Sequence, residues 1–279
     1  MRDQSTINAL TANVPNPFAG LLPGTTLNGS TVPASQLLVA YPQFTTVTLQ
    51  NENMGSSYFQ MFQTRLRKRF SGGMQVLVNY QYSKLIERTA RLNGGDATLV
   101  KDISPDDRPQ RFVASGSWDL PFGNGKHFWG SSGTVINGLI SGWSVNGIFT
   151  LQQGAALNWG NVLYLGGPLN NQPRNVGGVF DVTRFERDST KQLVNNLRTF
   201  ADRFSSLRQD GVNNLDFSAI KRFLLGEQAR LEYRVEFFNL LNHPLFNAPN
   251  LTPTSSSFGL LTSQANLPRR TQMALRFVW

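Results

Sequence analysis

The chain has 279 residues, which is enough for one large domain or two small ones. Charged residues make up 15% of it, against roughly 25% in soluble domains, while aromatic residues reach 11% and include 20 Phe. This composition suits strands that are wet on one face and apolar on the other. Cysteine is absent, which excludes disulfides and thiolate metal sites.

The formal net charge of +9 is compatible with an anionic partner, either a nucleic acid or a membrane surface. The densest basic run, residues 65–69, places Arg65, Arg67 and Arg69 on one face of an extended strand and Leu66 on the other. No recognised nucleic-acid fold surrounds this run, so we expect no nucleic-acid partner.

The sequence predicts neither a transmembrane helix nor a signal peptide. No stretch approaches the roughly 20 consecutive apolar residues that a transmembrane helix needs. The first six residues are not followed by an apolar region of the kind found in signal peptides. If the protein is exported, we expect its signal to lie upstream of this sequence, as in a fragment of a longer protein.

Residues 1–56 are expected to be an irregular segment that precedes the sheet, because five prolines interrupt any regular pattern. The stretch Phe44–Leu49 is β-prone and is the one candidate strand in this segment. Residues 57–279 differ in character, since apolar and polar residues alternate there with a period of two.

The first two alternating runs predict a long β-hairpin. The residues at 71–73, Ser-Gly-Gly, provide a tight turn between the two runs. Folding the chain back at this turn is expected to place Phe70 beside Met74 and Phe62 near Tyr82, so that the apolar faces of both strands coincide.

Five further alternating runs follow, at residues 112–120, 143–152, 215–223, 229–240 and 271–279. Three connections are long, at residues 85–109, 153–212 and 241–268, and part of the second, Phe180–Phe204, has helix-like spacing. Long connections alternate with shorter ones, as in membrane barrels that have short periplasmic turns and longer outer loops. This order predicts that the C-terminus lies on the periplasmic side.

These features predict an all-β fold: an antiparallel transmembrane β-barrel fragment of seven long strands, or eight with Phe44–Leu49. A strand of about 9–11 residues tilted near 45° crosses a bilayer, whereas strands in globular proteins average about 5–6 residues. Aromatic residues also lie near strand ends, as in interfacial girdles. They are Tyr58, Phe70, Tyr82, Trp118, Trp143 and Trp279.

The last strand has the form of a barrel-assembly signal. Met273, Leu275, Phe277 and Trp279 share one face, and the final residue is aromatic. An amphipathic edge strand of this kind can be captured by strand addition, which the barrel-assembly machinery uses. The alternative is an ordinary hydrophobic strand that happens to end in Trp.

No catalytic constellation is present, so we expect no enzyme activity and no cofactor. The only histidines, His127 and His243, are assigned to connections rather than to a metal site. The acidic group Asp102, Asp106 and Asp107 lacks the pattern of a calcium loop, and we expect it to be solvated outer loop.

Charged residues on the polar faces of the strands are better candidates for a structural role. We expect Arg65, Arg67 and Arg69 to face the lumen. We also expect Glu232, Arg234 and Glu236 to face it, together with Asp216 and Arg222 on the neighbouring strand, forming cross-strand pairs.

Several segments resemble the late barrel of Oar-like TonB-dependent receptors, and the resemblance runs over most of the chain in the family's order. The segments are Val14–Phe18, Thr31–Pro33, Tyr41–Phe44, Leu66–Phe70, Asp107–Phe112 and Glu236–Pro244. The resemblance implies a barrel of about 22 strands with a plug domain and a TonB-contacting segment before it. This chain would then be the C-terminal part of such a barrel.

A part of a barrel has free strand edges, so we expect an open, curved antiparallel sheet rather than a closed eight-stranded barrel. The implied protein lies in the Gram-negative outer membrane and takes up or translocates a ligand with energy from TonB. Its partners would be outer-membrane lipid, the assembly machinery, the plug with the remaining strands, and TonB. A passive porin or secretion barrel and a soluble β-rich binding protein are the alternatives, and the ligand is left open.

Overall fold

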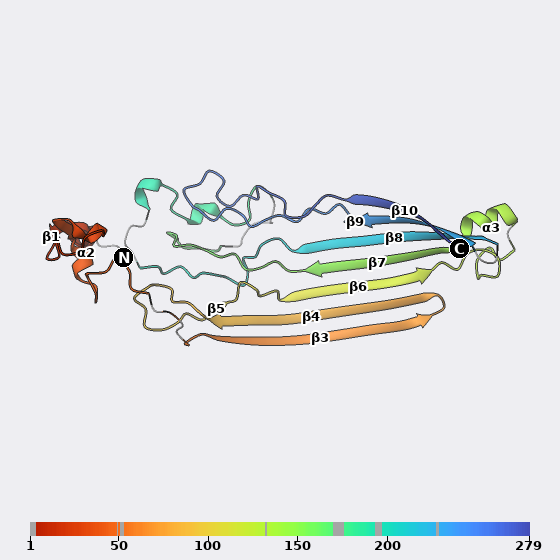
Figure 1. The fold of residues 1–279 in the computed structure, drawn as a ribbon, viewed down its shortest axis with the longest axis horizontal. Helices are drawn as coiled ribbons and strands as arrows, with labels where there is room; N and C mark the ends of the chain where they lie inside the picture. The colour runs from red at the N-terminus through yellow and green to blue at the C-terminus, as the bar shows by residue number, and fades with distance from the viewer. Residues whose placement is uncertain are drawn as a thin grey trace.

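The chain folds into one antiparallel sheet of long strands that carries irregular connections at both ends (Figure 1). The computed structural model describes residues 4–48, 50, 53–131, 133–169, 176–192, 197–226 and 229–279. The long strands are β3 (Ser56–Ser71), β4 (Met74–Arg88), β6 (Gln110–Asp119), β7 (Trp143–Gln152), β8 (Val212–Leu225), β9 (Ala229–Phe238) and β10 (Arg270–Val278). A two-residue strand, β5 (Asp102–Ile103), pairs with the end of β4.

The sheet is open, as the sequence predicts. Each long strand pairs with its sequence neighbours, which gives the order β10-β9-β8-β7-β6-β4-β3. Within the described residues nothing pairs with the outer edges of β3 and β10. The sequence-based prediction of seven long antiparallel strands is confirmed, and the chain does not close into a small barrel.

The prediction of a further strand at Phe44–Leu49 is wrong for residues 44–48, and Leu49 lies outside the described residues. The side-chain amide of Gln36 donates hydrogen bonds to the carbonyls of Pro42 and Phe44, both at 3.0 Å. A side chain from the preceding short helix therefore occupies the Phe44 carbonyl, a backbone acceptor at the start of the predicted strand.

The proline-rich N-terminal segment contains short elements that its sequence did not predict. They are α1 (Gln4–Thr11), β1 (Asn13–Pro15), η1 (Thr26–Asn28), β2 (Thr31–Pro33) and α2 (Ala34–Leu37), with β1 paired to β2. The buried side-chain amide of Asn16 donates to the carbonyls of Leu27 and Gly29, at 2.7 and 2.6 Å, and fixes the loop between the two strands.

Apolar and polar faces stay in register across the sheet. One row of paired residues runs through Leu66, Val78, Ala114, Phe149 and Leu215. The adjacent row, on the opposite face, runs through Arg65, Asn79, Val113, Thr150 and Asn214. Because a shift of one residue would reverse the faces of a strand, this register assembles one apolar surface from strands far apart in the sequence.

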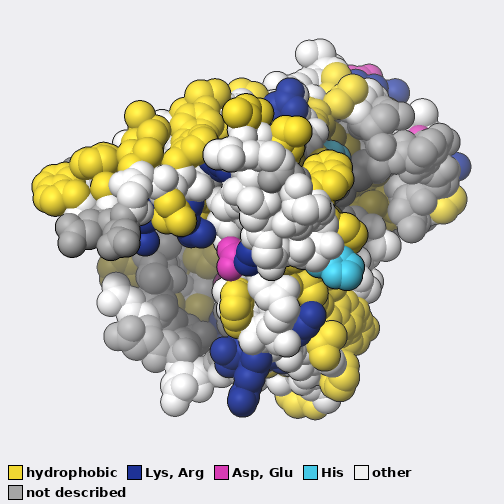
Figure 2. Space-filling view, turned by 90° about the vertical axis from the view of Figure 1, so that its right-hand side faces the viewer, with side chains coloured by type: hydrophobic (Ala, Val, Ile, Leu, Met, Phe, Trp, Pro, Cys, Tyr) yellow, Lys and Arg dark blue, Asp and Glu magenta, His cyan; other side chains and the backbone are white. Residues whose placement is uncertain are grey.

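The apolar face is largely uncovered. Leu66 and Leu275, near opposite edges of the sheet, are 69% and 67% exposed. Figure 2 views the molecule from the end that carries α3 (Thr134–Ile140) and the C-terminus; hydrophobic side chains gather at the upper left and lower right, and the molecule is hollowed on the left. The aromatic residues of the strands are thus not packed into a closed interior.

The β3–β4 turn differs in register from the sequence-based prediction. Phe62 pairs with Tyr82 as expected, but Met74 pairs with Ser71 and not with Phe70. A β-bulge between Lys68 and Ser71 supplies the extra residue. The turn therefore has two residues, Gly72 and Gly73, both with positive φ, as a type I′ turn requires.

Long and short connections lie at opposite ends of the sheet (Figure 1). The β3–β4 turn, the β8–β9 turn, the β6–β7 connection with α3, and the C-terminus lie at one end. The long connections and the N-terminal segment lie at the other, which we call the outer end. No helix in the described part of the chain is long and apolar enough to cross a membrane.

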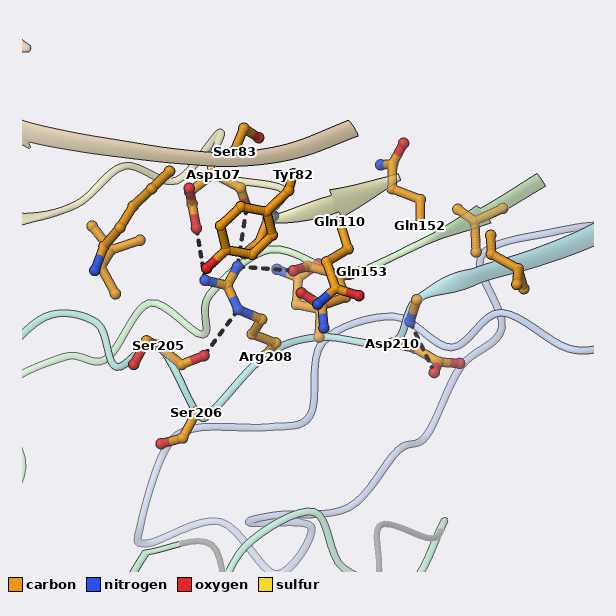
Figure 3. Close-up of a pocket in the computed structure, with 18 of the residues that line it drawn as sticks. Tyr82, Ser83, Asp107, Gln110, Gln152, Gln153, Ser205, Ser206, Arg208 and Asp210 are labelled. Atoms are coloured by element: carbon orange, nitrogen blue, oxygen red, sulfur yellow. Dashed lines mark hydrogen bonds and ion pairs between the residues drawn. The ribbon is translucent and has the colours of Figure 1, made fainter. Parts of the chain in front are cut away.

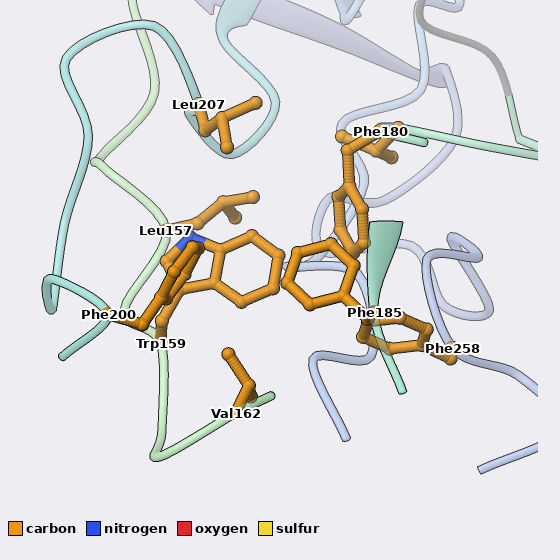
Figure 4. Packing of buried hydrophobic residues seen from close by; sticks show 9 residues of the cluster. Leu157, Trp159, Val162, Phe180, Phe185, Phe200, Leu207 and Phe258 are labelled. Carbon is orange, nitrogen blue, oxygen red and sulfur yellow. The ribbon is translucent and has the colours of Figure 1, made fainter. Parts of the chain in front are cut away.

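The main hydrophobic core lies in the connections of the outer end and not in the sheet (Figure 4). Trp159 stacks on Phe185 at 5.1 Å and meets Phe180 and Phe200 edge-on at 4.8 and 5.4 Å. Phe258 joins this cluster from the β9–β10 connection. Instead of the helix indicated by the spacing of Phe180–Phe204, its described residues form only the short turns η2 (Val182–Arg184) and η3 (Ser189–Lys191).

Candidate functional site

The outer end is built by contacts between connections that are distant in the sequence. The β7–β8 hairpin continues beyond the sheet, because the amide of Leu157 donates to the carbonyl of Leu207 and that of Gln209 donates to Ala155. This extension carries Arg208 to the start of β6, which follows the β4–β6 connection. Three sets of polar contacts, which we call ties, then join the β4–β6 connection to the β7–β8 connection.

The first tie is an ion pair between Asp107 and Arg208. The Arg208 Nη2 donates to the Asp107 carboxylate at 2.6 Å, and its Nη1 donates to the carbonyls of Asp107 and Gly154. The amide of Leu85 donates to the other oxygen of the same carboxylate at 2.7 Å. Asp107 is only 2% exposed, so the prediction that it belongs to solvated loop is wrong.

The second tie centres on Arg203. Its guanidinium lies 3.4 Å from the carboxylate of Asp102 and 3.5 Å from that of Glu87, and it donates to the carbonyl of Ile103 at 3.0 Å. The third tie is reciprocal: the Asn93 side chain accepts from the amide of Arg198 at 2.6 Å and donates to its carbonyl at 3.1 Å.

Burial raises the pKa of Asp102 above its ordinary value, although the amide of Ile103 and the charge of Arg203 oppose this shift. A carboxyl whose pKa is raised by folding stabilises the fold below its ordinary pKa of 3.8, and that contribution is lost as the pH rises through the raised value. The ion pair with Arg203 limits this loss, which keeps the tie in place when Asp102 is charged.

Two turns in the β7–β8 connection repeat one local arrangement. Asp181 accepts hydrogen bonds from the amide and hydroxyl of Thr183, at 3.0 and 2.6 Å. Asp188 does the same with Thr190, at 2.9 and 2.7 Å. These hydrogen bonds hold the pKa of each carboxyl below its ordinary value, and the bond from the Thr hydroxyl makes the largest contribution.

A cavity of about 1220 Å³ opens beside these ties (Figure 3). Its walls are the outer ends of β4, β6 and β7 and the segment 205–212. Most of its polar side chains are uncharged hydroxyls and amides: Tyr82, Ser83, Gln110, Gln152, Gln153, Ser205 and Ser206. Four charged residues also line it: Lys84, Asp107, Arg208 and Asp210. Arg208 is paired with Asp107, and the Asp210 carboxylate accepts the amides of Gly211 and Phe246, so most of the hydrogen-bonding groups of the lining are neutral.

The comparisons with known proteins bear on the sheet as a whole. The family model for an outer membrane beta barrel domain matches residues 1–272. The chain belongs to this outer-membrane β-barrel family. No match was found among curated proteins or among solved structures.

Membership of the outer-membrane β-barrel family places the protein in the outer membrane, as the sequence predicts. The long strands, the alternation of faces and the uncovered apolar surface agree with strands that cross a bilayer. In a barrel of this family the apolar face contacts lipid and the polar face lines the lumen.

Charged residues of this β-barrel form a connected group on the polar face of β8 and β9. Arg222 and Glu232 pair across the strands at 3.4 Å. Along β9, Arg234 lies 3.3 Å from Glu232 and 3.6 Å from Glu236. Asp216 lies outside this group, since its carboxylate accepts the amide of Asn239 at 2.9 Å.

The basic residues of β3 are divided by the bulge. Arg65 and Arg67 line a groove of about 450 Å³ on the polar face, together with Leu77, Ser115 and Asn146. Arg69 lies inside the bulge and is not among the residues that line the groove. That these side chains face the lumen of the complete barrel stays a prediction.

The C-terminal strand carries its apolar residues on the apolar face of the sheet. Met273 and Leu275 pair with Val235 and Tyr233, and Phe277 pairs with Leu231. The terminal Trp279 stacks on Phe277 at 5.7 Å. Recognition of this strand by the assembly machinery stays a prediction.

No group of acidic residues or histidines in the described part of the β-barrel could hold a metal ion. The ties at Asn93, Arg198, Arg203 and Arg208 were missed from the sequence. Their only signal was the segment Asp107–Phe112, noted for its family resemblance and not for a buried carboxylate.

Proposed function

We propose that this chain is the C-terminal part of an Oar-like TonB-dependent receptor, which takes up or translocates a ligand across the outer membrane with energy from TonB. The observation that carries the proposal is the open sheet of seven long strands, whose β3 and β10 edges are available for the remaining strands of a large barrel. The resemblance of segments such as Glu236–Pro244 to this group supports it.

The outer end supports a role in ligand capture. Its connections share an aromatic core and three polar ties, so the cavity beside them is held by fixed walls. A preformed cavity lowers the cost of ordering loops on binding. The polar face, with Arg234 between Glu232 and Glu236, would meet the plug domain.

A conductance measurement on the whole protein separates this proposal from a passive barrel. The protein, purified from the outer membrane with any preceding domain, is inserted into planar bilayers. A receptor whose plug fills the lumen should show no steady conductance, and it should bind the periplasmic domain of TonB. Steady open channels without TonB binding would favour the passive porin or secretion barrel instead.

Charge reversal tests the wall that would meet the plug. Arg234→Glu places three carboxylates in a row on β9, and it should weaken plug docking and open the lumen to ions. The conductance of this variant is compared with that of Arg276→Glu, which changes a charge on the same face of the edge strand β10. Unaltered assembly and plug docking in Arg234→Glu would count against this role.

A further inference from the structure

The β6–β7 connection, residues 120–142, presents an exposed apolar surface that takes no part in the pairing of the strands. Its helix α3 holds Val135, Ile136 and Leu139 at 78%, 57% and 66% exposure. Phe128 and Trp129 of the same connection are also exposed. Residues 127–145 contain no Asp, Glu, Lys or Arg.

This surface is held in place by its own contacts. The Asn137 side chain accepts from the amide of Asn124 at 2.6 Å, which joins α3 to the turn before it. Phe122 lies 5.7 Å from the rings of both Phe128 and Trp129. The helix therefore has a fixed position, although none of its residues is fully buried.

Two side chains show on which side of the sheet α3 lies. Trp143 and Lys221 are paired neighbours on the apolar face of β7 and β8. The Trp143 indole donates to the carbonyl of Leu139 at 2.9 Å, and the Lys221 ammonium donates to the carbonyl of Ser141. Because both donors rise from the apolar face, the end of α3 lies over that face and not over the polar one.

The surroundings of Lys221 support this placement of α3 over the apolar face. It is almost fully buried and is enclosed by the rings of Trp143 and Phe223, at 5.8 and 4.9 Å. A lysine on an apolar face is costly unless its charge is satisfied. Here a backbone carbonyl and two aromatic rings satisfy it, and in doing so they fasten the connection to the outside of the sheet.

We propose that α3 is an interfacial anchor that lies in the periplasmic leaflet of the outer membrane, with Val135, Ile136 and Leu139 in contact with lipid. The end of α3 is attached to the apolar face of the sheet, and the apolar side chains of α3 are exposed beside it. Exposed apolar patches of this kind mark sites of interaction with a membrane or a protein, and the absence of charged residues from 127–145 lowers the cost of contact with lipid. The inference goes beyond the proposed function and does not depend on energy coupling.

The test uses a fluorescent probe on single cysteines, since this chain has none of its own. Leu139→Cys and the control Thr134→Cys, on the opposite side of the same helix, are made in the whole protein. Unmutated protein labelled in parallel corrects for cysteines elsewhere. Each variant is reconstituted into vesicles of phosphatidylethanolamine and phosphatidylglycerol, and its fold is checked by the gel mobility of unheated samples.

A nitroxide-labelled lipid should quench the probe at 139 several-fold more than the probe at 134, and aqueous iodide should show the reverse order. Adding Val135→Asp to Leu139→Cys should expose the probe to iodide while the barrel stays folded. Iodide quenching of both probes to the same extent would overturn the anchor. Shielding of the probe at 139 from both quenchers would overturn it too, because a protein would then cover α3.

Discussion

At the scale of single residues, the carboxylate of Asp107 connects three parts of the outer end. One oxygen accepts the amide of Leu85 on β4, and the other accepts Arg208 from the β7–β8 connection. An ion pair out of water is favourable only when its remaining hydrogen-bonding groups are also satisfied. The carbonyls of Ser205 and Gly154, which accept from Arg208, meet that condition.

We therefore predict that Asp107→Ala loosens the outer end, while Asp106→Ala does not. Removing one partner of a buried pair costs about 3–5 kcal/mol, and exposed Asp106 should cost only about 0.5 kcal/mol. Limited proteolysis of intact outer membranes measures the effect, with cleavage expected between residues 197 and 211. Equal cleavage of both variants would mean that the aromatic core alone holds these connections.

The two Asp–Thr turns predict a pH dependence with a definite sign. Because folding lowers the pKa of Asp181 and Asp188, their contribution to stability is present above the ordinary value of 3.8 and is lost as the pH falls through the lower folded-state value. Hydrogen exchange at the amides of Thr183 and Thr190, corrected for intrinsic rate, should show protection falling in that acidic range.

Asp181→Asn provides the control for this pH effect. The asparagine oxygen can still accept from Thr183 but does not titrate in this range. Protection at Thr183 should become independent of pH in the variant, while Thr190 keeps its dependence. If Thr183 in the variant still loses protection on acidification, another group controls the turn.

At the scale of elements, the β3–β4 turn offers a matched pair of glycines. Both have positive φ, at 59° for Gly72 and 77° for Gly73. A Cβ at Gly72 would meet nothing within 4 Å, whereas one at Gly73 would lie 2.9 Å from the carbonyl oxygen of Asp119. The two positions therefore share a conformation but differ in the space available.

Asparagine tolerates this conformation, so Gly72→Asn should be nearly neutral. Gly73→Asn should destabilise the barrel by about 1–3 kcal/mol, the usual cost of forcing atoms into filled space. Urea unfolding of the whole protein in lipid vesicles compares the two variants. A loss of stability at Gly72 equal to that at Gly73 would assign the effect to backbone conformation instead.

The last strand leads to a prediction about assembly. If the machinery reads the apolar face of β10, Trp279→Ser should lower the amount of folded protein in the outer membrane several-fold. Arg276→Ser alters the opposite face of the same strand and should have little effect. Immunoblots of unheated membrane fractions measure the folded form. Equal amounts of both variants would show that Trp279 is an ordinary strand residue.

The strands could be predicted from sequence because their determinants are local. In β9 each residue from Arg230 to Phe237 alternates in character with its neighbours, so the pattern alone predicts both the strand and its faces. The bulge at Lys68–Ser71 could not be predicted, since it depends on pairing with β4 and leaves no mark in the composition of β3.

The candidate site could not be predicted from the sequence, because its determinants are contacts between residues far apart in the chain. Trp159, Phe185 and Phe258 contact one another across long stretches of irregular chain, and irregular segments have no period to detect. Arg208 and Asp107 are likewise about 100 residues apart in the sequence. The pairing of β6, β7, β8 and β9 in one sheet brings these connections together, so their contacts follow from the fold and not from local pattern.

At the scale of the whole molecule, the fold separates a polar surface from an apolar surface on the two faces of one sheet. The polar face contains the charged group around Arg234 and the groove at Arg65, while the apolar face is largely uncovered in the described structure, with α3 over only one end of it. A soluble sheet would bury such a face beneath a second layer. In a membrane barrel the lipid takes the place of that second layer, so a new charge should destabilise the fold on the apolar face and have little effect on the polar face.

Adjacent residues near the middle of β8 allow this test. Ala219 lies on the apolar face between Val145 and Val235, and Ser218 lies on the polar face between Asn146 and Glu236. Ala219→Arg should destabilise the barrel by about 2–4 kcal/mol, as expected for a cation near the bilayer midplane. Ser218→Arg should change stability by only about 0.5 kcal/mol, because water and the carboxylate of Glu236 can solvate the new charge. Unfolding in vesicles measures both, and equal losses in the two variants would mean that the apolar face of this sheet does not contact lipid.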